Sequence, residues 1–600
     1  MKMHPVKPVV SVLLIALVGL TTVATSLAQQ NILLIIADDL GADSIGLYST
    51  ASTAPTPVID SLAADGVLFT NAWANPTCSP TRAGVLTGRA SFRTGVGHPG
   101  DEIPLTEFTI PDALDTVGYA TACIGKWHLG GAGNGGDDNP NLMGYDHYEG
   151  ATGGGVSDYY NWTKVTNGTS STVTNYATSE TVDNALTWFA AQGSNPWFCQ
   201  LAFNAPHTPF HKPPNALHSY DSLSGTNADI NNNPLPYYQA AIEAMDTEIG
   251  RLMSSMNATT LANTNIIFVG DNGTPVQVSP GIVNAWKGFL YEGGVHVPFI
   301  ASGPAVATPL GRTNDATIHT VDLFETVLEL AGVDIPNTLP AGTTFDSVSI
   351  ADYLTNPAQA NYHAYSFTER FRTPTNVRDG KTIRNSTYKL IQFDSTGGEE
   401  FYNLVTDPTE SNDLLPGGLN ATELANYNTL VAELDTILNG GGGGTGGTVT
   451  ISDEDFEGGW GIWNDGGADA RRSANDSNWA NSGTFCIRLR DNTNTSVMTT
   501  DSLDLSVYTS ITVDFSYVAV NFNNSNEDFW LQISLDGGSS YTTVEEWNLN
   551  DEFSNTVREN DSVTIAGGFT ANTLLRFRCD ASANNDRLYI DDVVITGEQP

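Results

Sequence analysis

The chain has 600 residues, of which 67 are acidic and 25 are basic, so its formal net charge at pH 7 is -42. Its length exceeds what one ordinary core supports and predicts at least two domains. The acidic excess argues against nucleic acid or an anionic membrane as the general partner, because both need a basic surface. Any small anionic substrate therefore requires a locally basic site.

The first 28 residues are typical of a secretory signal peptide. Lys2 and Lys7 precede the apolar run VVSVLLIALVGL, and small residues at Ser26 and Ala28 offer a cleavage site after Ala28. The apolar run is shorter than the ~20 residues that span a bilayer, so we expect no membrane span. The mature protein is expected to be secreted, periplasmic or on the cell surface.

The rest of the chain divides at a glycine tract, residues 439–447, which predicts a flexible linker. Residues 29–438 alternate apolar strand-like runs with helical patterns, which predicts an α/β domain with a mainly parallel sheet. Residues 448–600 instead alternate apolar and polar residues in runs such as SITVDFSYVAV, LLRFRCDAS and RLYIDDVVITG. This pattern predicts an all-β sandwich, jelly-roll-like and resembling carbohydrate-binding accessory domains. Trp460, Trp463 and Trp479 are candidates for stacking on sugar rings, and for at least some of them we favour core packing or loop anchoring instead.

Four strand-like runs of the first domain end in polar or ionisable residues: NILLIIADD, ATACIGKWH, WFCQLAFNAPH and TNIIFVGDN. Ligands of open α/β sheets bind beyond the carboxyl ends of the strands, so these residues are expected to converge on one crevice. The set comprises Asp38, Asp39, Lys126, His128, His207, Asp271 and Asn272.

The set combines oxygen ligands with positive charge. Asp38, Asp39, Asp271 and Asn272 offer hard oxygen atoms without a thiolate cage, which favours one calcium ion, with magnesium as the alternative. The basic members supply the charge that an acidic protein needs to hold a small anion. They are Lys126, His128 and His207, joined by Arg82 and Lys287 from outside the four runs.

The stretch CSPTRAGVLTGR, residues 78–89, predicts a helix whose first residues sit beside a reactive thiol. Ser79 can cap the helix and Pro80 suits its first turn. Cys78 would then lie where backbone amides and the helix dipole favour an anion, within reach of Arg82 one turn later. A thiol in such surroundings is reactive.

CSPTR also matches the Cys-x-Pro-x-Arg signature of type I sulfatases, in which the cysteine is oxidised to formylglycine. Further segments resemble this family in the same order: ADDLG, GKWHLG, NAPHTP, GDNG, KGFLYEGG, VDLFETVLELAG and FYNLVTDPTESNDL. The resemblance runs from about Asn31 to about Leu415 and implies an alkaline-phosphatase-like fold and hydrolysis of sulfate esters of a sulfated carbohydrate. It departs from the family in EGGVHVP, which includes His296, where relatives often have an acidic residue, two glycines and then an arginine.

The resemblance also implies a role for each site residue. Cys78, converted by a formylglycine-generating enzyme, would supply the nucleophilic hydroxyl and would hold calcium with Asp38, Asp39, Asp271 and Asn272. Asp271 would help to deprotonate that hydroxyl, and Arg82 and Lys126 would stabilise the formylglycine oxygens. Lys287 and His207 would bind sulfate, His207 would protonate the leaving alcohol, and His128 would remove the second hydroxyl proton so that sulfate leaves.

Simpler explanations exist for each residue taken alone. Asp38 and Asp39 could begin a solvated turn, His207 could be a structural loop residue, and Lys287 could lie on the surface. Their ordered coincidence favours the site. The alternative functions are a phosphatase or phosphonate-ester hydrolase of the same superfamily, and a non-catalytic carbohydrate-binding surface protein.

The remaining cysteines divide between the two predicted domains. Cys123 and Cys199 lie in apolar strand patterns and are expected to be buried thiols. Cys486 and Cys579 both fall in the second domain, where an oxidising compartment allows a disulfide between them. The sequence leaves that pairing open.

Overall fold

The computed structural model describes residues 29–49, 53–279, 286–372, 376–438, 448–491, 493–506, 508–523, 527–549, 552–581, 583 and 585–598. The predicted signal peptide, residues 1–28, and the predicted linker, residues 439–447, lie outside this part of the chain. Within the described part, no helix combines the length and the apolar character that crossing a bilayer requires.

A ten-stranded mixed sheet organises the first part of the chain, in the order β10-β2-β9-β8-β1-β7-β3-β4-β5-β6. The strands are β1 Asn31–Asp38, β2 Gly66–Trp73, β3 Ala120–Lys126, β4 His147–Ala151, β5 Trp162–Thr166, β6 Thr169–Val173, β7 Trp197–Pro206, β8 Thr264–Gly270, β9 Phe299–Ser302 and β10 Arg312–His319. The four runs predicted as strands are the parallel neighbours β8, β1, β7 and β3, which confirms the mainly parallel sheet.

The central strands are buried on both faces, as strands of a parallel sheet covered by helices must be. In β1, Ile32, Leu34 and Ile36 enter one apolar core, while Leu33 and Ile35 enter the other. Each such side chain removed from water stabilises the fold by about 1.5–3 kcal/mol. The sheet is therefore a rigid support for the residues that follow its strands.

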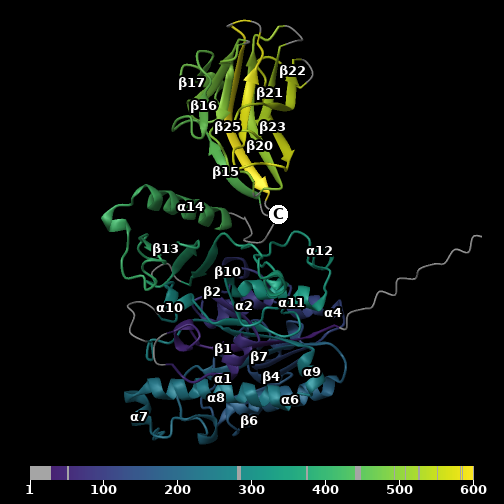
Figure 1. Cartoon of the computed structure of the whole chain (residues 1–600), viewed down its shortest axis with the longest axis vertical. Helices are drawn as coiled ribbons and strands as arrows, with labels where there is room; N and C mark the ends of the chain where they lie inside the picture. Colours follow the sequence, from purple (N-terminus) through teal and green to yellow (C-terminus); the bar gives the residue numbers. More distant parts are fainter. Residues whose placement is uncertain are drawn as a thin grey trace, which may run out of the picture.

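Helices cover the two faces of this sheet (Figure 1). One core contains apolar residues of α2 Cys78–Thr87, α4 Ile110–Asp115 and α11 Leu323–Ala331. The opposite core contains residues of α1 Pro57–Ala64, α6 Ala177–Gln192 and α8 Pro234–Ser255. The shorter helices are α3 Ser91–Thr94, α5 Asn139–Leu142, α7 Asn227–Asn232, α9 Ala258–Ala262, α10 Glu292–Val295, α12 Ile335–Thr338 and α13 Ala351–Thr355.

A smaller antiparallel sheet follows, in the order β11-β12-β13-β14. Its strands are β11 Ser366–Arg370, β12 Gly380–Arg384, β13 Tyr388–Phe393 and β14 Glu399–Asn403. Helix α14, Ala421–Leu438, packs Leu430 and Leu434 against Leu390 and Phe401 of this sheet.

The C-terminal strands form two antiparallel sheets with an apolar core between them, which confirms the predicted β-sandwich (Figure 1). The six-stranded sheet contains β15 Thr448–Glu454, β17 Ala470–Ser473, β18 Cys486–Arg490, β20 Ser510–Val520, β23 Arg558–Ala566 and β25 Arg587–Glu598. The five-stranded sheet contains β16 Trp463–Asp465, β19 Val497–Thr500, β21 Asp528–Ser534, β22 Thr542–Asn548 and β24 Leu574–Cys579.

Two possibilities that the sequence left open for this region are not realised in the structure. Trp463 is 1% exposed inside the sandwich core, so it cannot stack on a sugar ring. The thiols of Cys486 and Cys579 are free. Cys579 lies in the core between the sheets, whereas Cys486 belongs to a separate apolar cluster with Val518 and Tyr589, so the two thiols pack in different surroundings.

Candidate active site

Four oxygen-bearing side chains meet at the carboxyl ends of β1 and β8. Asp38 ends β1, and Asp39 follows it with a left-handed backbone, φ 65°. The Asp39 amide donates to Asp271 Oδ1 at 3.0 Å, and Asn272 Nδ2 donates to Asp39 Oδ1 at 2.9 Å. All four residues, Asp38, Asp39, Asp271 and Asn272, are at most 2% exposed.

Two oxygens of this group accept no hydrogen bond within the described structure, namely Asp38 Oδ1 and Asn272 Oδ1. A buried oxygen without a donor is costly unless something positive binds it. Asp38, Cys78 and Asp271 also place their ligand atoms within 4.8 Å of one another, as do Asp38, Asp39 and His207. This donor set, rich in hard oxygens, fits a divalent cation.

Cys78 is the first residue of α2 and is 1% exposed. Its Sγ lies 3.1 Å from His128 Nδ1. Ser79 does not cap the helix as predicted. Instead Ser79 Oγ donates to the His128 carbonyl at 2.9 Å and accepts from the Gly100 amide at 3.0 Å, so it ties α2 to the loop after β3.

Two buried cations stand between the carboxylates. Arg82 NH2 and Nε donate to Asp271 Oδ2 at 2.8 and 3.2 Å, and Arg82 NH1 donates to the Lys126 carbonyl. Lys126 Nζ lies 2.5 Å from Asp38 Oδ2. Buried charges of this kind are tolerated because each is paired and hydrogen-bonded.

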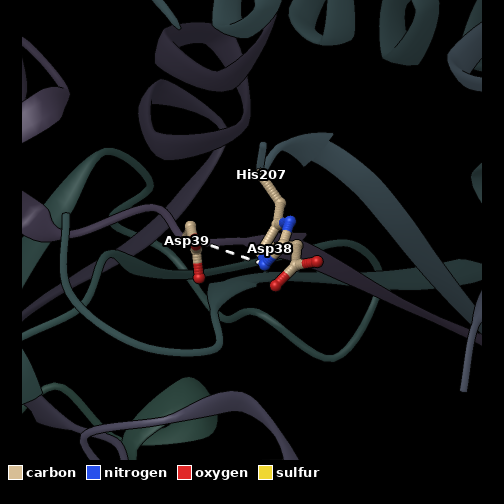
Figure 2. Close-up of side chains that lie close together, drawn as sticks. All are labelled: Asp38, Asp39 and His207. Carbon is tan, nitrogen blue, oxygen red and sulfur yellow. Dashed lines mark ion pairs between the residues drawn. The ribbon is translucent and has the colours of Figure 1, made fainter. Parts of the chain in front are cut away.

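His207 and Lys287 approach the site from the side of Asp39. Lys287 Nζ pairs with Asp39 Oδ1. His207 Nε2 lies 3.7 Å from Asp39 Oδ2, and Figure 2 shows this ion pair beside Asp38. Burial alone would raise the pKa of Asp39, but Lys287, His207 and Lys126 outweigh it and hold that pKa at about 2. Lys287 is 19% exposed and His207 20%, so both reach toward solvent, from which a substrate would enter.

His128 is neutral at ordinary pH. Burial, with further contributions from Lys126 and Arg82, lowers its pKa to about 3. Its Nδ1 faces the Cys78 sulfur and can therefore accept a proton from a group at that position. Asp271 shows the opposite tendency, because burial and the neighbouring Asp38 raise its pKa and make it a stronger base.

The formal charges of this site cancel without a metal ion. Arg82, Lys126 and Lys287 offset Asp38, Asp39 and Asp271. A divalent cation would leave the site with a net positive charge. The site can then attract an anionic ester group even though the whole chain is strongly negative.

Sequence reasoning missed the loop after β4. A methyl group added at Gly154 would lie 2.7 Å from His128 Nε2, and one added at Gly155 would lie 3.2 Å from His207 Nδ1. The loop therefore packs against the rings of both histidines, and only glycine fits at position 154 without moving the His128 ring. The Gly-Gly-Gly run at 153–155 was the available signal.

His296, the departure from the family pattern, packs beside β2 with its Nε2 2.9 Å from the Thr70 carbonyl oxygen. This contact joins two segments of the fold. His211 stacks on Tyr159 with ring centroids 3.8 Å apart, and Tyr159 in turn donates to the His207 carbonyl at 2.8 Å. His211 therefore supports the loop that carries His207.

Comparisons with known proteins agree with this geometry. The model of the sulfatase family matches residues 30–333, and that of the N-sulphoglucosamine sulphohydrolase C-terminal region matches residues 285–437. Arylsulfatase G of Rattus norvegicus is 28% identical over 462 residues, which cover 67% of this chain and 85% of the rat protein. N-acetylgalactosamine-6-sulfatase of Sus scrofa is 30% identical over 345 residues, 51% of this chain and 63% of the pig protein.

Solved structures show the same fold. The crystal structure of Ps i-CgsB in complex with k-i-k-neocarrahexaose superposes with a TM-score of 0.58 at 25% identity, and the match covers 68% of this chain and 92% of that chain. The fold is thus the alkaline-phosphatase-like fold of sulfatases. Because the sulfatase model matches just over half of the 600 residues, the chain belongs to the type I sulfatase family and is a sulfatase.

Proposed function

We propose that this sulfatase is a secreted sulfuric ester hydrolase that removes sulfate from a sulfated carbohydrate. The nucleophile would be a formylglycine hydrate derived from Cys78, and a calcium ion would assist. The proposal rests on one observation. Cys78 Sγ and Asp38 Oδ1, which accepts no hydrogen bond, belong to the same buried site. His128 contacts the sulfur, and His207 and Lys287 contact the neighbouring Asp39. In this structure Sγ stands where the hydrate oxygens would be.

Asp38, Asp39, Asp271, Asn272 and the converted residue 78 would hold the ion. Calcium would polarise a sulfate oxygen and lower the barrier to attack at sulfur. Calcium is preferred to magnesium because the donors are numerous and come from several loops, whereas magnesium keeps most of its water ligands.

The first chemical step forms a bond between a hydroxyl oxygen of residue 78 and sulfur, and breaks the bond between sulfur and the sugar oxygen. Asp271 takes the proton of the attacking hydroxyl, and Arg82 and Lys126 stabilise the oxygens of residue 78. Lys287 and His207 bind the sulfate, and protonated His207 gives its proton to the departing sugar oxygen. Its exposure and its contact with Asp39 favour this role.

The second step regenerates the enzyme. His128 takes the proton of the remaining hydroxyl through Nδ1, the carbon–oxygen bond to sulfate breaks, and the aldehyde forms again and adds water. The depressed pKa of His128 keeps its ring neutral and ready to accept that proton. Splitting one hydrolysis into two steps lowers the highest barrier.

The substrate class rests on the relatives and on the second predicted domain. The pig relative is named N-acetylgalactosamine-6-sulfatase, and Ps i-CgsB was crystallised with neocarrahexaose. We propose that residues 29–438 form the catalytic domain and that residues 448–600 attach the enzyme to polymeric substrate. The signal sequence of residues 1–28 and a formylglycine-generating enzyme would precede activity.

Parallel assays of an aryl sulfate and the matching aryl phosphate test the proposal. Turnover of the sulfate should exceed that of the phosphate, and Cys78→Ala should abolish sulfate turnover while thermal unfolding stays cooperative. Preference for the phosphate, or full activity of Cys78→Ala, would instead support the phosphatase alternative. Absence of turnover of either ester in calcium-loaded protein with converted residue 78 would support the non-catalytic alternative.

A further inference from the structure

Four arginines gather on the outer face of the six-stranded sheet of the C-terminal sandwich. Arg471 of β17 is paired in register with Arg488 of β18, and Arg490 of β18 is paired with Arg587 of β25. Side chains alternate along a strand, and the residues between them lie in the core between the sheets, so these four point outward. The core residues are Ala470, Ile487, Leu489 and Leu588.

Cross-strand pairs of like charge are unfavourable, because the Cβ atoms of directly opposed residues lie only ~5 Å apart. Two carboxylates reduce this repulsion: Asp476 lies 3.5 Å from Arg488 NH1, and Asp469 lies 3.3 Å from Arg490 Nε. Arg471 is exposed and makes no ion pair with a described residue, and Arg587 makes none either. This arginine face therefore keeps a net positive charge.

Two of these guanidinium groups also have an unused donor. Arg488 Nε and Arg587 Nε are buried and have no hydrogen-bond partner within the described structure. Burial lowers the pKa of Arg488, and Arg587 and Arg490 lower it further against the opposing effect of Asp476. The pKa of Arg587 is instead raised, mainly by its hydrogen bond to Tyr589. The arginine face thus gathers four of the 25 basic residues of a chain with net charge -42.

An aromatic pair borders the arginine face. Trp479 stacks on Tyr589 with ring centroids 5.8 Å apart and planes 19° apart. Tyr589 is paired in register with Arg488, and its hydroxyl donates to Asp476 at 3.3 Å. Trp479 is only partly buried, so part of this residue remains accessible to solvent beside the charged groups.

We propose that the arginine face, Arg471, Arg488, Arg490 and Arg587 with Trp479 beside them, is a non-catalytic binding site for a sulfated polysaccharide chain. The proposal rests on the proposed function and names the surface by which the second domain would hold polymer. Arginine suits this ligand because its planar fork makes paired hydrogen bonds to the oxygens of a sulfate group. The aromatic edge adds an apolar contact for a sugar ring.

Charge complementarity favours this occupant over nucleic acid. Nucleic acids carry one charge for every ~1.7 Å of duplex and need a long basic track, whereas four arginines fill a short surface on a chain that is acidic elsewhere. A glycan with spaced sulfate groups places a few charges on the arginine face and leaves neutral sugar over the acidic surroundings.

The test measures binding of the full-length protein to dextran sulfate and to dextran by isothermal titration calorimetry at fixed salt. Dextran sulfate should bind and dextran should not. The double variant Arg471→Gln/Arg587→Gln should weaken binding at least about tenfold, because each lost contact to a charged group costs about that factor. These two arginines are chosen because their removal leaves no carboxylate unpaired.

The matched control is Arg576→Gln/Arg578→Gln, two arginines of β24 in the other sheet, which should leave binding within twofold. Aryl sulfate turnover should be unchanged in both double variants. Three results would overturn the proposal. Arg471→Gln/Arg587→Gln could bind dextran sulfate as tightly as wild type, or both double variants could lose the same affinity for it. Wild type could also bind single-stranded DNA of the same charge as tightly as dextran sulfate. If the enzyme hydrolyses no sulfate ester yet binding responds as predicted, the proposed function fails and the binding site stands.

Discussion

His207 is the side chain whose role the structure allows to be tested most sharply at the residue scale. If His207 protonates the leaving oxygen, the decrease in kcat caused by His207→Gln should depend on the basicity of that oxygen. We expect kcat to fall by about 10²–10⁴ for a sugar sulfate and far less for nitrophenyl sulfate, whose leaving group is stable as an anion.

Steady-state kinetics on the two substrates measure this difference. His147→Gln is the control, because His147 lies at the start of β4, has a partly exposed ring and should change neither rate. Equal losses on both substrates in His207→Gln would show that the residue only binds sulfate.

Asp38 should be needed for the effect of calcium on stability. A ligand that binds only the folded protein stabilises it by about 2.7 kcal/mol at a hundred times its Kd, so calcium should raise the Tm of wild type by several degrees. Asp38→Asn should remove most of that rise, because its Oδ1 is one of the unsatisfied oxygens.

Differential scanning calorimetry of wild type and Asp38→Asn, each with calcium and with a chelator, measures the rise in Tm that calcium causes. Asp112→Asn, which alters the capping box of α4, serves as a control that changes Tm without changing its response to calcium. A calcium response that persists in Asp38→Asn would place the ion elsewhere.

At the scale of elements, the loop after β4 sets the position of His128. Gly154→Ala should lower kcat/KM at least about tenfold, because the added methyl group would lie 2.7 Å from the ring and push it from residue 78. Gly153→Ala is a control in the same loop, since nothing lies within 4 Å of its added methyl group. Steady-state kinetics and Tm of both variants test this prediction. Unchanged kcat/KM in Gly154→Ala would show that the loop moves to accommodate the methyl group and leaves His128 in place.

The contact between β11 and α3 should make stability depend on pH. Glu369 accepts from the Phe92 amide at 2.5 Å, and burial raises its pKa from 4.5 to about 8. A carboxyl whose pKa is higher in the folded state stabilises fully below its unfolded pKa and loses that contribution as pH rises through the folded value. The loss between pH 5 and pH 8 is about 3 kcal/mol.

Glu369→Gln cannot ionise, so its Tm relative to wild type should rise as pH increases from 5 to 9. Glu329→Gln on the exposed side of α11 should show no such trend. A constant difference in Tm between Glu369→Gln and wild type across this range would mean that Glu369 is charged at all these pH values.

Local sequence predicted the elements better than the contacts between them. β1, β3, β7 and β8 were predictable because an apolar run followed by polar residues is a local signal. Ser79 was misread as a cap because its partner, the His128 carbonyl, lies 49 residues away. Lys287 follows no predicted strand, so local sequence offered it only as one of several basic residues, and its pairing with Asp39 requires the three-dimensional structure.

The same limit explains what the sequence left open in the C-terminal region. The alternation of apolar residues predicted its strands, but alternation alone does not say which tryptophan faces the core. Trp463 faces inward and Trp479 lies on the outer face. The outward row of arginines was present in the sequence as alternate positions of CIRLR, yet its pairing with Arg471 and Arg587 depends on strand register.

At the scale of the whole molecule, the excess of 67 acidic over 25 basic residues should make stability increase with salt. Salt shortens the screening length from about 30 Å at 0.01 M to about 3 Å at 1 M and so weakens self-repulsion in the compact state. Tm measured in sodium chloride at saturating calcium should rise across this range. A falling Tm would show that attractive pairs such as Arg82 with Asp271 outweigh the general repulsion.

The claim on which the mechanism depends is that Cys78 becomes formylglycine inside the buried crevice. Mass spectrometry of the peptide that contains residue 78, from active enzyme made in its native host, tests this most directly. We predict a mass loss corresponding to replacement of the thiol by an aldehyde. An unmodified thiol in fully active protein would contradict the mechanism.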